Sequence, residues 1–372
     1  MALRAVSKRA SGASDGPAGL RSALRRAGDD ATLSIQGADV EVSNLDRVYW
    51  PAGEGLQRPA VTKRDFLRYL VDWAQPMIDA MRDRPLTLFR WPEGIGGRRV
   101  LMKHWEIRLP AFVERVDIFS ASKGRSDQYI LCNNLATLVW LGHMGTLEFH
   151  SWHSRVRGGA DAPALRTDAR SSLRSLQASA VEYPDYMLFD IDPFFYSGSE
   201  VRPRDPSPTA EGFMRARRVA LMLKTLLDGM SLGSFVKTTG KTGLHVVVPI
   251  ERTLRYDAVR AVAKGIGDHL MRAHPDEITV DWSIERRTGK VFIDYNMNVR
   301  GKSMTVPYSP RGLPGAPVSM PLTWRELEKL DATALPDFSI ATMPRRRADA
   351  WAGVRRQPQN LEQRLKAGDG KR

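Results

Sequence analysis

Alternating and helical patterns of apolar residues divide the chain into strands and helices. Apolar side chains at helical spacing predict helices, which fall at 62–81, 133–141, 210–230 and 257–273. Apolar runs bounded by Gly and Pro predict strands, which fall at 33–51, 84–102, 146–155, 183–193, 233–250 and 278–296. We expect the last of these segments to be a hairpin that turns near Thr288–Lys290. The pattern indicates a globular chain in which strands and helices are mixed.

The stretch at 183–193, YPDYMLFDIDP, joins a buried strand pattern to two carboxylates. Asp190 and Asp192 share one face of this strand, and Pro193 ends it because proline cannot donate to the sheet. Two carboxylates about 4 Å apart repel by about 4 kcal/mol at an effective dielectric near 20. A hard cation, Mg²⁺ or Mn²⁺, is therefore expected between them. The alternative is that Asp-x-Asp here is only a polar exit into a turn.

A second strand pattern, VFIDYN at 291–296, also carries a carboxylate in an apolar run. Asp294 shares a face with Phe292 on this strand. Three carboxylates from two strands, Asp190, Asp192 and Asp294, suit a two-metal site for in-line phosphoryl or nucleotidyl transfer. The second strand therefore favours the metal interpretation over the polar exit.

The segment 233–250, GSFVKTTGKTGLHVVVPI, contains a GKT that invites comparison with a nucleotide P-loop. That template fails because Phe235 stands where the first glycine belongs and the segment continues into a strand. We expect instead a strand, a tight turn and a second strand led by His245. Such a turn can aim backbone N–H groups, the Thr239 hydroxyl and His245 at phosphate oxygens. A plain hairpin with a solvated lysine is the alternative.

Several other cations and histidines are candidates for binding anions. Lys302 and Arg311 flank a short predicted strand, an arrangement that delivers cations to phosphates from loops. Lys63 at a predicted helix start, with Arg47 in the preceding loop, suits an anion or is simply a solvated surface charge.

The predicted hairpin at 84–102 is strongly basic, and Lys103 follows it directly. His150 and His153 lie on a predicted strand and point to opposite faces, so at most one of them joins a given site. A structural histidine is the default interpretation for each.

Composition narrows the class of protein. The 372 residues are 42% hydrophobic, enough for one large or two modest domains. The net charge of +14 predicts a polyanionic partner, unless it serves only solubility. The single cysteine, Cys132, excludes a disulfide framework and fits a reducing compartment. Without an apolar run of membrane length or a signal pattern, we expect a cytoplasmic protein with no membrane partner.

Three segments have weak apolar patterning. We expect a disordered basic tail at 1–32, an exposed insertion at 156–182, and a basic C-terminal tail or helix at 344–372.

The motifs DYMLFDIDP, KTTGKTGLHVVVP and VFIDYNMNVRGKSMTVPYSPRGLPGAPVS together resemble the polymerase domain of bacterial DNA ligase D, in the archaeo-eukaryotic primase superfamily. SNLDRVYWP, RPLTLFRWPEGI and CNNLATLVWLGHMGTLEFHSWHSR resemble the same domain in the same order. The resemblance covers about 33–365 and implies an α+β primase-polymerase fold over 33–343, with mixed and antiparallel central sheets flanked by helices. It also implies a metal-dependent, template-directed nucleotidyltransferase that favours ribonucleotides and acts at gaps and broken ends in non-homologous end joining. The implied partners are DNA with gaps or broken ends, NTP or dNTP, Ku and a separate DNA ligase.

The resemblance also implies roles for individual residues. Asp190, Asp192 and Asp294 match metal-binding carboxylates that hold Mn²⁺ or Mg²⁺. The matches around the nucleotide are His245 and Arg311 at the triphosphate, Thr239 where the family usually has serine, Lys302 in the same basic loop and His150 near the sugar. At the DNA, Lys63 matches a 5′-phosphate lysine, Arg47 stands where that site has a second lysine, and Lys103 belongs to the basic hairpin.

The sequence departs from the family pattern in three ways. Thr242 precedes Gly243 where a lysine is expected, and Val100 and Leu101 replace an aromatic pair. No ligase or nuclease domain is attached, so we expect a stand-alone polymerase that needs a ligase in trans. The alternatives are a replicative or plasmid-type primase that starts chains without a primer, and a non-catalytic module that binds DNA ends.

Overall fold

The computed structural model describes residues 16–53, 58–105, 108–158, 168–193, 209–330, 337–344 and 347–369. The N-terminal half contains, in chain order, α1 (Pro17–Arg26), β1 (Ala31–Ile35), β2 (Ala38–Val42), β3 (Val48–Trp50), β4 (Val61–Thr62), α2 (Lys63–Asp72), α3 (Ala74–Met81), β5 (Leu86–Arg90), β6 (Val100–Met102), β7 (Glu114–Ser120), β8 (Arg125–Leu131), α4 (Leu135–His143) and β9 (Thr146–Trp152). The C-terminal half contains α5 (Leu173–Gln177), η1 (Ala180–Glu182), β10 (Tyr186–Asp192), α6 (Ala210–Gly229), β11 (Phe235–Thr238), β12 (Leu244–Pro249), α7 (Tyr256–Ala273), β13 (Ile278–Thr279), η2 (Ile284–Arg287), β14 (Val291–Asp294), η3 (Tyr295–Met297), β15 (Ser303–Thr305), β16 (Pro321–Leu322), α8 (Trp324–Glu328) and α9 (Leu361–Asp369).

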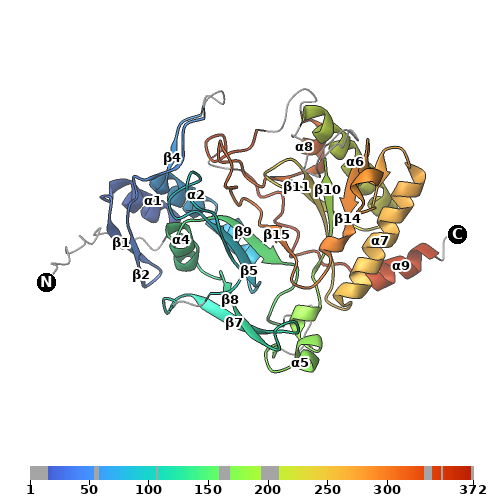
Figure 1. The fold of residues 1–372 in the computed structure, drawn as a ribbon, viewed down its shortest axis with the longest axis horizontal. Coiled ribbons are helices and arrows are strands. Elements are labelled where there is room, and N and C mark those ends of the chain that lie inside the picture. The colour runs from blue at the N-terminus through green and yellow to red at the C-terminus, as the bar shows by residue number, and fades with distance from the viewer. Residues whose placement is uncertain are drawn as a thin grey trace.

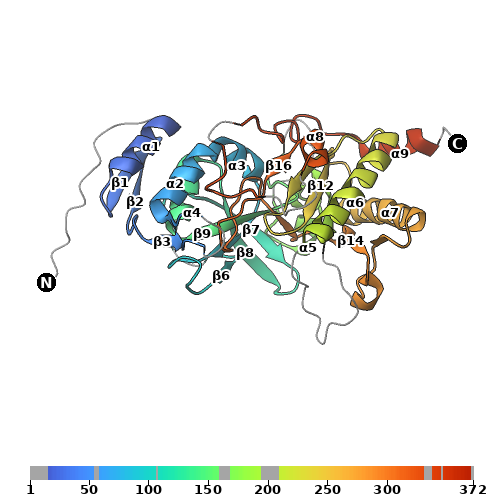
Figure 2. The ribbon, with the colours of Figure 1, turned by 90° about the horizontal axis from the view of Figure 1, so that it is seen from above.

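Two sheets organise the molecule. A six-stranded sheet has the order β13-β14-β10-β12-β11-β16, and a four-stranded sheet has the order β15-β9-β5-β6. The six-stranded sheet lies beside α6 and α7, whereas the N-terminal strands and helices lie at the other end of the molecule (Figures 1 and 2). Within the described ranges, every helix is too short or too polar to span a lipid bilayer.

Strand β10 divides its side chains between two environments. Met187, Phe189 and Ile191 are fully buried in the main core, together with apolar residues of α6 and α7. Leu188 points to the other face, where it packs in a separate cluster with Met304 of β15. Because side chains alternate along a strand, Asp190 and Asp192 share the face of Leu188 and point away from the helices. The alternation predicted at 183–193 is present, and it points both carboxylates toward the four-stranded sheet.

The predicted helix at 62–81 is two helices. Its start is confirmed, because Thr62 and Asp65 form a capping box at the beginning of α2. The helix ends at Asp72, and α3 begins at Ala74. Pro76 explains the break, since it has no N–H and its ring would collide with the carbonyl of the residue four positions earlier.

The predicted hairpin at 278–296 is wrong in its strand direction. Strand β13 pairs with β14 in parallel, with Ile278 opposite Val291. The connection folds back through η2, where the Arg287 guanidinium donates to the carbonyl oxygens of Asp281 and Trp282, both at 3.1 Å. These hydrogen bonds hold a compact crossover in place of a hairpin turn.

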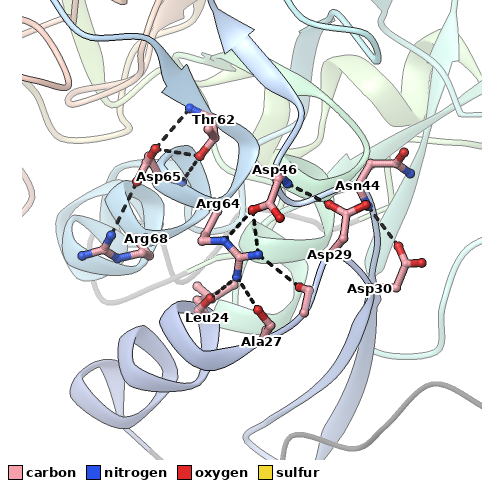
Figure 3. A network of polar contacts seen from close by, with 11 residues as sticks. Leu24, Ala27, Asp29, Asp30, Asn44, Asp46, Thr62, Arg64, Asp65 and Arg68 are labelled. Carbon is pink, nitrogen blue, oxygen red and sulfur yellow. Dashed lines mark hydrogen bonds and ion pairs between the residues drawn. The ribbon is translucent and has the colours of Figure 1, made fainter.

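The predicted tail at 1–32 is wrong for the residues that the structure describes. Pro17–Arg26 forms α1, and its Leu20 and Leu24 are buried in the main core. Arg64 of α2 donates to the carbonyl oxygens of Leu24 and Ala27 at the end of this helix, at 2.6 and 2.8 Å (Figure 3). Residues 1–15 of the predicted tail lie outside the described residues.

The segment 156–182, expected to be an exposed insertion, is partly exposed and partly buried where the structure describes it. Its buried residues, Val156, Ala169, Leu176 and Val181, form a small apolar cluster with Ile118, Leu131 and Trp152. The cluster lies beneath the β7–β8 hairpin, so the segment supports that hairpin. Residues 159–167 lie outside the described residues.

The predicted basic tail at 344–372 folds onto the sheet over most of its described length. Trp351 is buried and its indole N–H donates to the carbonyl of Val236 at 3.0 Å. The helix that was expected as the alternative is present as α9, with Leu361 buried at its start. Sequence patterning missed these contacts because only a few apolar residues carry them.

Candidate active site

The three predicted carboxylates share one face of the six-stranded sheet. Asp190 of β10 lies directly opposite Asp294 of β14, and Asp192 lies opposite Phe292. Residues directly opposite in an antiparallel pair have Cβ atoms about 4.5–5.5 Å apart and project from the same face. The register therefore places Asp294 on the same sheet face as the other two acids, directly opposite Asp190.

This pairing continues across the sheet as a row of ionisable side chains. Asp190 also lies opposite His245 of β12, and His245 lies opposite Lys237 of β11. The row therefore runs Asp294, Asp190, His245, Lys237 over four neighbouring strands. Its acids stand at one end and its basic groups at the other.

The two paired acids resist ionisation. Burial raises the pKa of Asp190 to about 6, although Lys237 and Arg311 act against the shift. Burial and then the charge of Asp190 raise the pKa of Asp294 to about 6. The Asp190 side chain is 30% exposed and Asp294 is 9% exposed, so a charge placed on either acid is poorly solvated. A cation at this end of the row would relieve that penalty.

A cavity of about 250 Å³ opens beside the row. The predicted site residues that line it are His150, Asp190, Asp192, Thr239, His245 and Arg311. They come from β9, β10, the β11–β12 turn, β12 and the loop after β15, so residues distant in sequence converge here. A larger hollow of about 890 Å³ lies over α6, but Arg215 and Arg218 there are paired with Glu211 and Glu277. The smaller cavity therefore holds the candidate chemistry.

Two basic groups in this cavity keep unused hydrogen-bonding atoms. Nδ1 of His245 and Nε of Arg311 are buried, and neither has a hydrogen-bond partner among the described residues. Nε2 of His245 lies 3.4 Å from Asp190. Burial, followed by the charges of Lys237 and Arg311, holds the pKa of His245 well below its usual range. Because a buried polar group without a partner is costly, these atoms suit a polar ligand.

Arg311 is held in place by its neighbours. Its guanidinium lies 3.2 Å from Glu148 and donates to the Thr239 carbonyl at 3.0 Å and to the Thr305 hydroxyl at 2.5 Å. Glu148 also contacts His150 at 3.3 Å and accepts from the backbone N–H of Gly312. Burial opposes the ionisation of Glu148, yet the hydrogen bond from His150 and the charge of Arg311 lower its pKa to about 2. Glu148 therefore orients both a candidate triphosphate cation and a candidate sugar contact.

Glu148 and Lys237 were missed by the sequence analysis. Lys237 is fully buried and its ammonium donates to the Ser319 hydroxyl at 2.6 Å. Burial and Arg311 hold its pKa well below the usual range. A signal was present, since each is an ionisable residue in an apolar strand and Glu148 stands two positions before His150 on the same face.

The turn between β11 and β12 corrects one expectation. The Thr239 hydroxyl oxygen accepts from the backbone N–H groups of Lys241 and Gly243, at 3.3 and 3.1 Å. These two N–H groups already have partners, so they are not aimed at phosphate oxygens in the way the sequence suggested. Thr239 shapes the turn, while its side chain lines the cavity.

The remaining candidates lie around this centre. Lys302, exposed just before β15, is near enough to Asp294 for its charge to lower the pKa of that acid, against burial and Asp190. Lys103 is exposed just after β6, at the edge of the four-stranded sheet, and does not line the cavity. His153 is fully buried, which agrees with the default structural interpretation.

Lys63 and Arg47 adjoin each other in the N-terminal half. The Lys63 backbone N–H donates to the Arg47 carbonyl at 2.8 Å, and the Lys63 ammonium donates to the Ser43 carbonyl at 2.8 Å. Burial, then the nearby charge of Arg47, lower the pKa of Lys63 to about 8. A buried ammonium beside an exposed guanidinium is an arrangement that suits a phosphate.

This N-terminal region also supports the loop that carries Arg311. The Trp50 indole N–H donates to the Arg311 carbonyl at 3.1 Å, and the Tyr69 hydroxyl donates to the Tyr308 carbonyl at 2.7 Å. Trp73 stacks on Tyr308 with ring centroids 4.4 Å apart. These three aromatic side chains of the N-terminal region therefore hold the loop that carries Tyr308 and Arg311 in place.

The acids fit a divalent cation by their chemistry. Carboxylate oxygens are the ligands that Mg²⁺ and Mn²⁺ prefer, and the opposed pair Asp190 and Asp294 has raised pKa values. In the part of the chain that the structure describes, no three His, Cys, Asp or Glu side chains converge closely enough to hold an ion. A bound ion would therefore have to draw the carboxylates together.

Comparison with known proteins identifies the family. The LigD primase-polymerase domain matches residues 62–352. The multifunctional non-homologous end joining protein LigD of Pseudomonas aeruginosa is 30% identical over 339 residues, which cover 91% of this chain and 34% of that protein. The bifunctional LigD of Bacillus subtilis is 25% identical over 305 residues, covering 82% of this chain and 42% of that protein. The chain therefore spans about a third to two fifths of the length of these relatives.

The fold agrees with a solved member of the family. The polymerase domain from Mycobacterium tuberculosis ligase D, in complex with DNA, matches with a TM-score of 0.66 at 25% sequence identity. The match covers 88% of this chain and 98% of that domain. The predicted α+β fold and the predicted family are both confirmed, and the chain belongs to the LigD primase-polymerase domain family.

Proposed function

We propose that this chain is a metal-dependent, template-directed nucleotidyltransferase that extends a primer strand at gaps and broken ends during non-homologous end joining. The observation that carries the proposal is the row Asp294, Asp190, His245, Lys237, which places acids and basic groups at opposite ends of one sheet face. Nucleotidyl transfer needs both, because the acids hold ions at the attacking oxygen and the basic groups bind the leaving pyrophosphate.

The acidic end of the row prepares the primer. Asp190, Asp192 and Asp294 would hold Mn²⁺ or Mg²⁺, and a bound ion lowers the pKa of the 3′-hydroxyl and neutralises phosphate charge. Asp294 keeps one oxygen engaged with the backbone N–H of Asn296 at 2.7 Å, which fixes its orientation. Asp294 is thereby fixed before an ion binds, the other carboxylates would move toward the ion, and the primer end would lie beside β14.

The basic side of the cavity, formed by His245 of the row and by Arg311, binds the nucleotide. Arg311, anchored by Glu148, and His245, with its unused Nδ1, face the cavity where the triphosphate would lie. Donors fixed before the reaction stabilise charge that develops on the phosphates without rearrangement. His150, held by Glu148, would meet the sugar, which is where a preference for ribonucleotides would be set.

The DNA contacts lie outside the cavity. Lys63 and Arg47 would bind the 5′-phosphate across a gap, and the basic hairpin with Lys103 would follow the backbone. The relative from Mycobacterium tuberculosis was solved in complex with DNA, which supports DNA as the partner. Binding through phosphates falls steeply with salt. Ku and a DNA ligase would be the protein partners, at the nucleoid.

Primer extension on gapped DNA tests the proposal. We expect the wild-type protein to add nucleotides in the presence of Mn²⁺ or Mg²⁺, and to add ribonucleotides faster than deoxyribonucleotides. Asp294→Ala should lose nucleotide addition, by at least about a hundredfold, while keeping its fold and its DNA affinity. Undiminished extension by Asp294→Ala would overturn the mechanism. Synthesis on unprimed single strands that matches synthesis on gapped duplex would favour a primase instead.

A further inference from the structure

Trp282 is an exposed aromatic side chain beside the candidate active site. It is 53% exposed, the highest value among the large apolar side chains of the described ranges; the next, Leu101, is 51% exposed. It lies in the crossover between β13 and β14, the strand that carries Asp294. A single exposed apolar side chain is not by itself a sign of binding, so the inference depends on where this indole lies and how it is held.

The indole is held in one orientation by its neighbours. Its ring meets that of Phe292 edge to face, with centroids 5.6 Å apart. The Arg287 guanidinium lies 3.6 Å from the Phe292 ring and 5.4 Å from the Trp282 ring, and it donates to the Trp282 carbonyl. Asp281 accepts from the backbone N–H of Ser283 at 2.9 Å, which fixes the following turn. Because the segment is already ordered, a ligand that binds to this ring causes little further loss of conformational entropy.

The sheet register places this ring next to the carboxylates. Phe292, on which the indole rests, lies directly opposite Asp192 and stands two residues before Asp294 on the same face. Trp282 therefore adjoins the acidic end of the row, on the β13 side. The basic groups His245 and Lys237 lie on the opposite side, toward β12 and β11.

Because the two sides of the row differ in chemistry, each suits a different substrate of the proposed reaction. A triphosphate belongs beside His245 and Arg311, because its charge needs basic groups. The strand that ends in the attacking hydroxyl then approaches from the β14 side, where the aromatic ring of Trp282 is exposed, as are the cations Arg286 and Lys302. Aromatic rings stack on the faces of bases without regard to sequence, which suits a polymerase that must accept any primer end.

We propose that Trp282 stacks on a base at or next to the 3′ end of the primer strand and so positions the attacking hydroxyl. This inference rests on the proposed function and names a contact for the strand that is extended. Trp282 is a positioning residue, since it acts through the primer and does not contact the reacting atoms. The partner chemistry is an unpaired or terminal nucleobase with a free 3′-hydroxyl.

The test compares Trp282→Ala and Trp282→Phe with the wild-type protein. The control variant is Leu173→Ala, because Leu173 is also an exposed apolar residue but lies on α5, more than a hundred residues before Trp282 in the sequence. Affinity for a fluorescent DNA with a single-stranded 3′ overhang is measured by anisotropy. We expect Trp282→Ala to weaken binding roughly tenfold, Trp282→Phe to stay within about threefold, and Leu173→Ala to match the wild type. In primer extension, the KM for DNA should rise in Trp282→Ala while the KM for nucleotide stays unchanged.

Intrinsic fluorescence gives a second readout that does not depend on activity. Stacking on a base quenches an indole, so DNA should quench the wild-type protein more than Trp282→Phe. Equal quenching, together with an unchanged DNA affinity of Trp282→Ala, would overturn the stacking proposal. If the wild-type protein still extends primers in that case, the proposed function is unaffected. Trp282-dependent DNA binding without extension by the wild-type protein would instead overturn the proposed function and keep the stacking contact.

Discussion

A buried carboxylate, Asp185, precedes β10, and a half-buried one, Asp190, lies near its other end, and the two are in opposite electrostatic states. Asp185, just before the strand, makes ion pairs with Arg84 at 2.7 Å and Arg155 at 2.6 Å. Burial alone would raise its pKa, but these two guanidinium groups hold the pKa below the usual range. At the other end, burial raises the pKa of Asp190 to about 6, and its nearest basic partner is the poorly protonated His245.

This difference separates a structural ion pair from a binding site. The protein compensates the charge of Asp185 with its own arginines, so nothing further is needed there. It compensates the charges of Asp190 and Asp294 only in part, through Lys237, Arg311 and Lys302, so both pKa values stay raised. The remaining penalty costs folding free energy, and a bound cation would relieve it. Acids whose counter-charges are incomplete mark this end of the strand as the candidate functional site.

The largest effect should come from breaking the compensated end. Arg84→Ala leaves Asp185 as a buried charge with only Arg155 beside it, and we expect it to lower the free energy of unfolding by about 3–5 kcal/mol. Urea denaturation at pH 7 measures the loss, with the exposed Arg325→Ala as the matched control. A loss under 1 kcal/mol would mean that the pair is not structural.

Removing the charge of Asp294, at the other end of the comparison, should instead stabilise the protein. The folded pKa of Asp294, about 6, lies above the ordinary value of 3.8, so its ionisation disfavours folding. The penalty is absent below pH 3.8 and complete above pH 6. Asp294→Asn should therefore raise the free energy of unfolding at pH 7.5 by about 1–3 kcal/mol, with no gain at pH 3.5. Denaturation in EDTA at both pH values measures this, and Mn²⁺ should stabilise only the wild type.

A loss of stability in Asp294→Asn at pH 7.5 would contradict the comparison. It would show that Asp294 is held by protein contacts in the manner of Asp185. The neutral amide keeps the size and shape of the carboxylate, so packing changes are small in this variant.

The smallest effect concerns Lys63. Its pKa of about 8 means that the ammonium is charged at pH 7 and mostly neutral at pH 9. We expect Lys63→Met to weaken binding of 5′-phosphorylated gapped DNA about tenfold at pH 7, and DNA without that phosphate far less. The wild-type preference for the phosphate should itself decline between pH 7 and pH 9. Fluorescence anisotropy with both DNAs measures it, and equal losses on the two DNAs would exclude Lys63 from a phosphate site.

Local patterns predicted the elements that carry the chemistry. Alternation around Asp190 gave the correct face of β10, and the same reasoning placed Asp294 on a second strand. The Thr62 and Asp65 capping box gave the correct start of α2. These features depend on nearest neighbours along the chain, and the sequence contains that information directly.

Features that depend on distant partners were not predictable in this way. The parallel pairing of β13 is accompanied by a crossover in which Arg287 donates to two backbone carbonyls, and such hydrogen bonds leave no mark in apolar periodicity. Leu20 and Leu24 form too short an apolar stripe to reveal α1 without the Arg64 contacts. Lys237 and Glu148 look like interruptions in apolar strands until the register sets them beside His245 and Arg311.

The aromatic support of the Arg311 loop limits how this fold can be divided. Trp50, Tyr69 and Trp73 come from the first quarter of the chain, yet they hold a loop that follows β15. A fragment that begins at β10 would keep Asp190, Asp192 and Asp294, but it would lose Glu148 and the aromatic side chains that hold the Arg311 loop. The C-terminal half is therefore not a module that can be transplanted alone. Insertions or truncations near β3 should disturb the position of Arg311, although they lie far from it in the sequence.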